Sequence, residues 1–245
     1  AWVRNANGDG AHCQLAWSRD HGRSWTWADW RFEQFGYCTF LNFGPNYAGA
    51  RDGYVYVYSH DDPSAYRPAD SMVLARVPKG AVTQREAYEF FAGPDGEGRP
   101  TWTRHAEGRA PVFTHRHRCL RSSVSYNAPL RRVLLCTEHT ASFEGNLGMF
   151  DAPQPWGPWT TVGYHHDWAG FGSTFFWNFA NKWVSADGKD FTFVFTGTDA
   201  DGDNDSWNTV DGSFDAITPA GGRIRAVTTL SVTATDNDGV VETRF

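Results

Sequence analysis

The sequence has little charge and no block of basic residues. Charged residues make up 20% of the 245 residues, and the formal net charge is −6. Proteins that bind nucleic acid usually carry a cluster of Lys and Arg, so we expect no nucleic-acid partner. The chain also lacks an apolar run of about 18 residues, the length that a membrane-spanning helix needs. We therefore expect no membrane span.

Helical periodicity is almost as scarce. Only residues 84–91 place their apolar side chains on one helical face, so we expect a short helix or a helical turn there. Elsewhere, short apolar or alternating runs lie between turn residues at short intervals, a pattern that predicts an all-β protein. The clearest predicted strands are residues 54–58, 72–77, 132–137, 147–150, 159–164, 182–185 and 191–196.

The spacing of these strands favours a β-propeller over a sandwich or a barrel. Strand pairs closed by a hairpin are expected near residues 15–30, 54–77, 122–150 and 159–196. With their neighbouring strands they form four-strand groups of about 40 to 50 residues, which is the size of a propeller blade. We predict a propeller domain over residues 1–215 with about four to five blades. It forms either a small ring or part of a larger, N-terminally truncated one, and the strand-like first residues favour the larger ring.

The last thirty residues differ in composition from the rest. Aromatic residues nearly vanish after Asp215, and residues 230–243 have the pattern of a hairpin around an Asp-Asn-Asp-Gly turn. Residues 216–245 are therefore either the last strands of the propeller or the start of an immunoglobulin-like module.

Cysteines are few, and aromatic residues are many. The four cysteines are compatible with buried thiols, with one disulfide, or with a structural Zn²⁺ site that also uses neighbouring histidines. The residues of the zinc hypothesis are His12, Cys13, His115, His117 and Cys119; the remaining cysteines are Cys38 and Cys136.

Aromatic residues make up 16% of the chain, including 12 Trp. Such residues fill sheet cores, and they also stack on sugar rings.

Residues 18–25 form the most specific motif. They read Ser-Arg-Asp-His-Gly-Arg-Ser-Trp and match Ser-x-Asp-x-Gly-x-Ser/Thr-Trp. Asp20 is expected to accept hydrogen bonds from backbone N–H groups of a hairpin, Gly22 to supply a turn conformation, and Trp25 to pack into the blade core. A shortened version follows at residues 185–191. The motif has a structural meaning and carries no chemistry itself.

This motif is the Asp-box of sialidase-like propellers, and the resemblance extends further. The chain resembles secreted microbial propellers that act on polysaccharides, including ulvan-lyase-like proteins. The resemblance implies an extracellular or periplasmic protein, part of a larger multidomain chain, with a polysaccharide as its partner. The segments that carry it are residues 41–52, 72–79, 87–93, 150–159 and 181–188.

The first functional hypothesis is a lyase that cleaves a uronate-containing glycan by β-elimination. Tyr or His can act as its base or acid, and Arg can neutralise the uronate carboxylate. The same residues also have ordinary structural interpretations in core packing, salt bridges or turns. The catalytic candidates are Tyr47, Arg51, His60, Arg121 and Tyr126, and the substrate-binding candidates are Asn46, His117 and Trp177.

Two other functions remain open on the same fold. A sialidase-like or arabinanase-like glycoside hydrolase would need two carboxylates about 5 to 10 Å apart, and Asp61 with Asp62 is the best exposed pair. The other alternative is a glycan-binding module without catalysis.

An acidic segment near residue 200 predicts a metal. Four carboxylates alternate along it, and Ca²⁺ prefers such oxygen ligands, although the spacing is not that of an EF-hand. The alternative is a solvated acidic loop. The four residues are Asp199, Asp201, Asp203 and Asp205.

Overall fold

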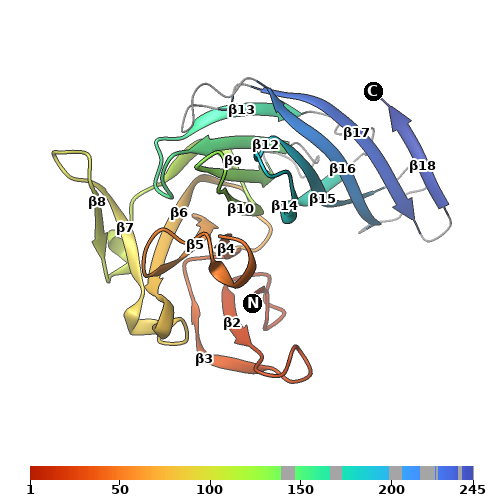
Figure 1. Cartoon of the computed structure of the whole chain (residues 1–245). Helices are drawn as coiled ribbons and strands as arrows, with labels where there is room; N and C mark the ends of the chain where they lie inside the picture. Colours follow the sequence, from red (N-terminus) through yellow and green to blue (C-terminus); the bar gives the residue numbers. More distant parts are fainter. Residues whose placement is uncertain are drawn as a thin grey trace. The chain divides into compact units, whose positions relative to one another are not determined.

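The computed structural model describes residues 1–138, 147–165, 173–198, 206–215, 224, 226–236 and 239–244. Nearly all of their regular structure is β (Figure 1), which confirms the predicted all-β, propeller-like fold. The chain forms two compact units. Unit 1 consists of residues 1–41 and 51–120, and unit 2 of residues 42–50 and 121–245. The predicted calcium segment, Asp199, Asp201, Asp203 and Asp205, lies outside the described residues.

Unit 1 contains two antiparallel sets of strands. The first is β1 (Trp2–Arg4), β2 (Cys13–Trp17) and β3 (Thr26–Phe32), in that order. The second runs through β4 (Thr39–Asn42), β5 (Tyr54–His60), β6 (Ala69–Pro78), β7 (Glu89–Pro94) and β8 (Pro100–Thr103). In addition, β9 (Phe113–Cys119) pairs with the first half of β6. The predicted pairing of residues 54–58 with 72–77 is confirmed.

An aromatic core holds the two sets together. Tyr88 packs edge-on against Phe32 with ring centroids 5.3 Å apart, and Phe32 also contacts Phe35 and Phe90. All four side chains are buried, and Trp2 and Trp30 pack around them. Burying aromatic side chains of this size contributes several kcal/mol in total. This core explains part of the high aromatic content without any sugar contact.

The expected helix at residues 84–91 is a single turn. The 3-10 helix η3 covers Arg85–Ala87, and β7 begins at Glu89. Phe90 and Phe91 were assigned to one helical face, but both are buried on a strand that pairs with β6 on one side and β8 on the other. A strand that pairs with a neighbour on each side can bury consecutive side chains. In a short apolar run, this pattern looks the same as one face of a helix.

Unit 2 consists of two up-and-down antiparallel sets, each in sequence order. The first is β10 (Ser122–Asn127), β11 (Arg132–Glu138), β12 (Leu147–Ala152) and β13 (Thr160–His165). The second is β14 (Ser173–Val184), β15 (Asp190–Thr198), β16 (Ser206–Asp215), β17 (Ala226–Asp236) and β18 (Gly239–Arg244). The grouping of residues 159–196 into one blade was wrong, because β13 pairs with β12.

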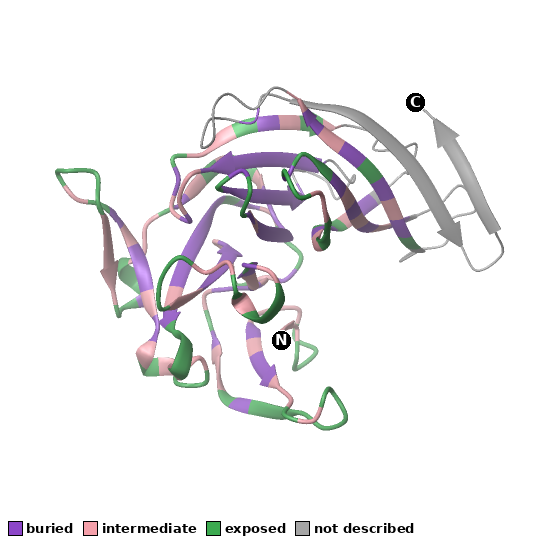
Figure 2. Cartoon of the chain, viewed as in Figure 1, coloured by how far each residue is buried: buried purple, intermediate pink, exposed green. Residues whose placement is uncertain are grey.

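The core of unit 2 lies between these two sets. Along β15, the side chains of Phe191, Phe193 and Phe195 point inward, and the residues between them are only partly buried. They pack with Phe179 and with residues of β11 and β12 in one apolar cluster. Figure 2 shows this burial along β10, β11 and β12. The alternation explains why the outer face of β15 is free to carry polar side chains.

The predicted hairpin in the last thirty residues is present. Asp236 pairs with Gly239 at its end, and the first of its strands, β17, pairs with β16 from Asp215 to Asn208. This pairing is the geometry expected if residues 216–245 are last strands of the fold. The boundary at residue 215 stays a prediction. No helix in the described part of the chain has the length and hydrophobicity needed to cross a bilayer.

The Asp-box at residues 18–25 folds as its sequence predicts. Ser24 donates hydrogen bonds to Asp20 from both its hydroxyl and its backbone N–H, at 2.7 and 2.9 Å. The Ser18 hydroxyl donates to Asp20 as well, and Gly22 adopts φ 86°. These hydrogen bonds from Ser24 and Ser18 lower the pKa of Asp20 to about 2.

The expectation for Trp25 was wrong. Its side chain is 51% exposed and lies beside Gly22 instead of in the core. Strand periodicity gives the reason, because Ala28 points inward and Trp25 falls on the opposite side, with the exposed Trp27.

We predict a pH-dependent loss of stability in the Asp20→Asn variant. The pKa of Asp20 is lower in the folded than in the unfolded chain, so its stabilisation is fully present above about pH 4 and is lost as the pH falls towards about 2. Urea unfolding should therefore show a lower midpoint for the variant at neutral pH and a shrinking difference as the pH is lowered. Asp29→Asn, at an exposed position on β3, is the control. A difference that is independent of pH would contradict the assignment.

Candidate functional site

A tight loop at residues 42–50 forms one side of the candidate site in unit 2. The 3-10 turn η1 covers Pro45–Tyr47, and the loop closes through a hydrogen bond from Gly49 N–H to Phe43 O at 2.9 Å. A Cβ atom at Gly49 would lie 2.7 Å from that carbonyl oxygen, so only glycine fits there. Asn46 and Tyr47 adopt positive φ angles of 52° and 61°. Two consecutive non-glycine residues in this region are uncommon and occur preferentially at functional sites.

This loop packs against the end of β10. The Phe43 ring contacts the rings of Tyr47 and Tyr126, with centroid distances of 5.0 and 5.3 Å. Asn46 lies exposed at the tip, and Tyr47 and Tyr126 are half-buried. The structure thus brings three of the predicted site residues, Asn46, Tyr47 and Tyr126, to one place.

A pocket of about 270 Å³ lies between this loop, the turn after β10 and the end of β14. Its wall is part aromatic and part polar, and among its described lining residues none is Asp, Glu, Lys, Arg or His. The lining residues are Phe43, Gly44, Pro45, Ala48, Gly49, Tyr126, Asn127, Ala128, Pro129, Asn181, Val184 and Ser185.

Two turns hold the polar wall in place. Asn127 donates from its side-chain nitrogen to Gly188 O at 2.8 Å and accepts from Leu130 N–H at 3.2 Å. Gly188 has φ 80°, and a Cβ there would lie 2.4 Å from the Asn127 oxygen. The Ser185 hydroxyl donates to Asp187 at 2.7 Å and accepts from Asp190 N–H at 2.9 Å. The shortened Asp-box predicted at residues 185–191 is therefore present, and it forms part of the pocket.

Asn181 connects the polar wall to the loop. Oriented to satisfy both of its neighbours, its amide accepts from Gly44 N–H at 3.1 Å and donates to Phe179 O at 3.2 Å. Sequence reasoning missed Asn127, Asn181 and Ser185 as site residues. Ser185 begins the predicted shortened Asp-box at residues 185–191, whereas no motif in the sequence analysis marked Asn127 or Asn181 as a binding residue.

Arg121 has a structural environment. Its guanidinium lies 2.6 Å from Glu138 in a buried ion pair, and it lies over the rings of Phe175 and Phe176 at 5.3 and 5.5 Å. The carboxylate of Glu138 already neutralises the Arg121 charge, which the lyase hypothesis assigned to a uronate. Trp177 also has a packing role, because it is 2% exposed in the unit 2 core and cannot stack on a sugar in this conformation.

The other predicted residues lie in unit 1. Arg51 is exposed, and His60 is buried with its Nε2 atom 2.8 Å from Ser64 O. His117 is exposed, pairs with Asp70 at 3.0 Å and has φ 57°. Asp61 binds Arg109 at 2.6 Å and Asp62 binds Arg67 at 3.0 Å, so both carboxylates of the hydrolase pair are engaged in ion pairs.

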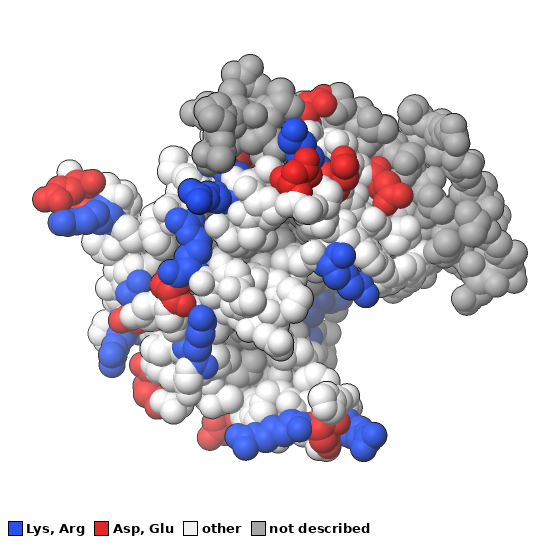
Figure 3. Space-filling model, in the orientation of Figure 1, with Lys and Arg blue, Asp and Glu red and all other residues white. Residues whose placement is uncertain are grey.

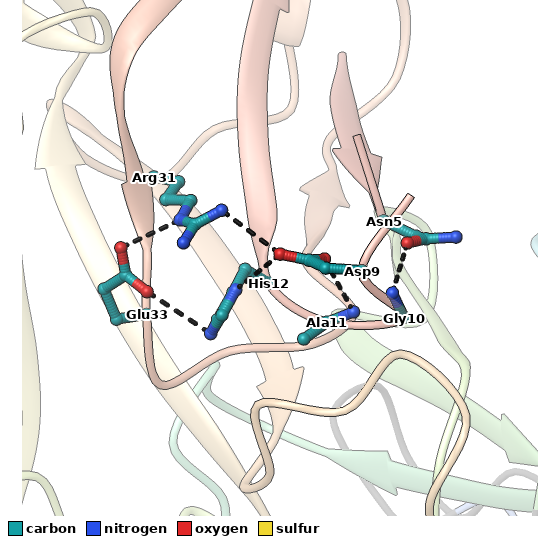
Figure 4. Close-up of polar contacts among 7 residues, drawn as sticks. All are labelled: Asn5, Asp9, Gly10, Ala11, His12, Arg31 and Glu33. Atoms are coloured by element: carbon teal, nitrogen blue, oxygen red, sulfur yellow. Dashed lines mark hydrogen bonds and ion pairs between the residues drawn. The ribbon is translucent and has the colours of Figure 1, made fainter. Parts of the chain in front are cut away.

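Among the described residues, the cysteines and histidines of the zinc hypothesis form no group of three or more side chains that could hold a metal ion. All four cysteines are buried free thiols, and Cys13 Sγ accepts from Cys38 N–H at 2.9 Å. Burial raises the pKa of Cys119 to about 12. His12 lies between two carboxylates, with Asp9 at its Nδ1 atom and Glu33 at its Nε2 atom, and Arg31 binds both acids (Figure 4). The zinc site stays a prediction without geometric support.

We predict that Arg121 and Glu138 stabilise the fold as a pair. Arg121→Met or Glu138→Leu alone leaves a buried charge without its partner and should cost about 3–5 kcal/mol of the free energy of unfolding. The double variant should cost clearly less than the sum of the two single variants, measured by urea unfolding of all four proteins. Additive effects would show that the two side chains do not interact as the structure indicates.

Comparison with known proteins gives a family and no named function. No curated protein matches the chain. A family model described as a domain of unknown function, DUF4185, matches residues 1–196, which is most of the sequence. The chain therefore belongs to the DUF4185 family.

Proposed function

We propose that this chain recognises a polysaccharide and that the unit 2 pocket receives a neutral sugar residue of it. The observation that carries the proposal is the composition of the pocket. The half-buried Tyr126 lines the same space as two side-chain amides and a hydroxyl, and its ring packs against the buried ring of Phe43. The pocket of about 270 Å³ can enclose one sugar ring or part of one.

A sugar ring has an apolar C–H face and a rim of hydroxyl groups. The C–H face packs on an aromatic ring, and the hydroxyls need partners that both donate and accept. Amides meet this need. Each side-chain nitrogen of Asn127 and Asn181 has two N–H groups and each oxygen two lone pairs, so their structural hydrogen bonds still leave capacity for a ligand.

The uncharged lining favours a neutral sugar over a uronate. A buried carboxylate needs a cation or several hydrogen-bond donors. The described lining contains no Lys, Arg or His, and Arg121 is bound to Glu138. The geometry thus supports the glycan-binding alternative better than β-elimination.

Cleavage is the second candidate function. Tyr126 lines the pocket, and a phenol can act as the acid or base that a lyase needs. A hydrolase would need two carboxylates, which the described lining residues do not supply. The two reactions are separable, because a lyase forms an unsaturated uronate that absorbs ultraviolet light and a hydrolase forms only new reducing ends. An extracellular or periplasmic setting in a multidomain protein is part of this proposal.

We predict that Ala48→Trp weakens glycan binding by blocking the first pocket. Ala48 is exposed, lines the pocket and has backbone angles that any residue adopts, so an indole there fills the pocket without removing a structural contact. Isothermal titration with neutral oligosaccharides of arabinose, xylose, glucose and galactose, and with uronate-containing glycans, should show binding to a neutral glycan. The variant should weaken that binding at least about tenfold, or about 1.4 kcal/mol.

Ala186→Trp is the matched control. Ala186 is exposed near the pocket but does not line it, so its variant should bind like the wild type. Ala48→Trp binding as tightly as the wild type would place recognition elsewhere. Tighter binding to uronate glycans than to neutral ones, with ultraviolet-absorbing products, would replace the proposal with the lyase.

A further inference from the structure

A second hollow lies on the outer face of the β14–β16 strands, in the same unit. Its volume is about 350 Å³. It shares one lining residue, Ser185, with the first pocket, so both hollows border the start of the turn that follows β14. The lining residues are Trp183, Ser185, Asp190, Phe191, Thr192, Asp211, Gly212 and Ser213.

The strand register explains why polar side chains gather there. Asp190 pairs with Ser213 and Thr192 pairs with Asp211 on neighbouring strands. Because Phe191 and Phe193 point into the core, these four side chains share the outer face. Thr192 donates its hydroxyl to Asp211 at 2.7 Å, which orients that carboxylate. Acidic side chains are exposed over the strands of unit 2 in Figure 3.

Trp183 adds an aromatic surface to these oxygen atoms. Its indole is 41% exposed, although burial of a side chain of this size would contribute several kcal/mol. The ammonium of Lys182 lies 4.7 Å from the centre of the ring, close to one of its faces. An exposed indole beside two carboxylates and several hydroxyls matches the two sides of a sugar, the C–H face and the hydroxyl rim.

We propose that this hollow is a second sugar-binding site for the same glycan chain. A sugar residue stacks on Trp183, and its adjacent hydroxyls donate to the carboxylates of Asp190 and Asp211. Carboxylates are acceptors only, so the site selects a sugar with free neighbouring hydroxyls and repels a uronate. Because Ser185 borders both hollows, one chain can occupy them together and gain affinity from the second contact. This inference rests on the proposed function of the first pocket.

The test compares disaccharides with long oligosaccharides of arabinose, xylose, glucose and galactose by isothermal titration. Trp183→Ala and Asp211→Asn should weaken binding of the long oligosaccharide by about tenfold, or about 1.4 kcal/mol, and leave disaccharide binding at the first pocket unchanged. Trp207→Ala is the control. Trp207 is 59% exposed near the start of β16 but does not line the hollow, so its loss should change neither affinity.

The variants also separate the two proposals. With Ala48→Trp blocking the first pocket, weak binding of the long oligosaccharide should persist and should disappear when Trp183→Ala is added. If Trp183→Ala binds the long oligosaccharide like the wild type while Ala48→Trp does not, the second site is overturned and the first pocket stands. If the wild type binds none of these glycans, both proposals fail together.

Discussion

The contact between Asn127 and Gly188 is the interaction on which the architecture of unit 2 depends. Asn127 ends β10, and Gly188 lies in the turn between β14 and β15, so their hydrogen bond joins the two sets of strands at one edge. The aromatic core between these sets contributes far more free energy, but apolar contacts are not directional. The Asn127 amide, with its oxygen on Leu130 N–H, fixes where the two turns meet. Both hollows border the turn that it holds.

The same contact explains why the turn keeps its short motif. The Ser185 hydroxyl links Asp187 to the backbone of Asp190, and Gly188 provides both the left-handed conformation and the space for Asn127. A motif that is purely structural in its hydrogen bonds therefore positions a residue, Ser185, that lines both proposed binding sites. Structural and functional roles are not alternatives at this turn.

Local patterns predicted the strands and the Asp-box because their causes are local. The Ser-Asp-Gly-Ser spacing at residues 18–25 determines hydrogen bonds within a few residues, and the strand at residues 54–58 pairs with the next strand along the chain. Trp25 failed because a motif does not tell which side of a strand faces the core. Asn127 and Asn181 were missed because their role arises only when segments far apart in the sequence come together. Arg121 looked catalytic because its partner, Glu138, lies across a hairpin and resembles any other strand-end acid.

The distribution of charge explains why the first pocket is neutral. Glu138 and Asp151 are fully buried, and each is bound to an arginine, Arg121 and Arg132, at 2.6 Å. A buried charge needs such a partner, so these four side chains stabilise the fold. If one of them turned to bind a ligand, its partner would remain as an unpaired buried charge, which has a large desolvation cost. Outside the core, Arg99 pairs with Asp95 and Glu97 on the β7–β8 hairpin, and blue and red atoms lie next to each other there in Figure 3.

The loop at residues 42–50 gives the proposed sugar site a wall whose conformation is determined by contacts within unit 2. Positive φ angles at Asn46 and Tyr47 cost of order 1–3 kcal/mol each, and this strain persists only where surrounding contacts determine the conformation. The Phe43 ring between Tyr47 and Tyr126, the Gly49 hydrogen bond and the Asn181 amide supply those contacts. The loop is therefore ordered before a ligand arrives. A flexible loop would have to become ordered on binding, and the lost conformational entropy would weaken the affinity. A pre-formed wall avoids this cost, so the proposed sugar site needs fewer amide and aromatic contacts to bind.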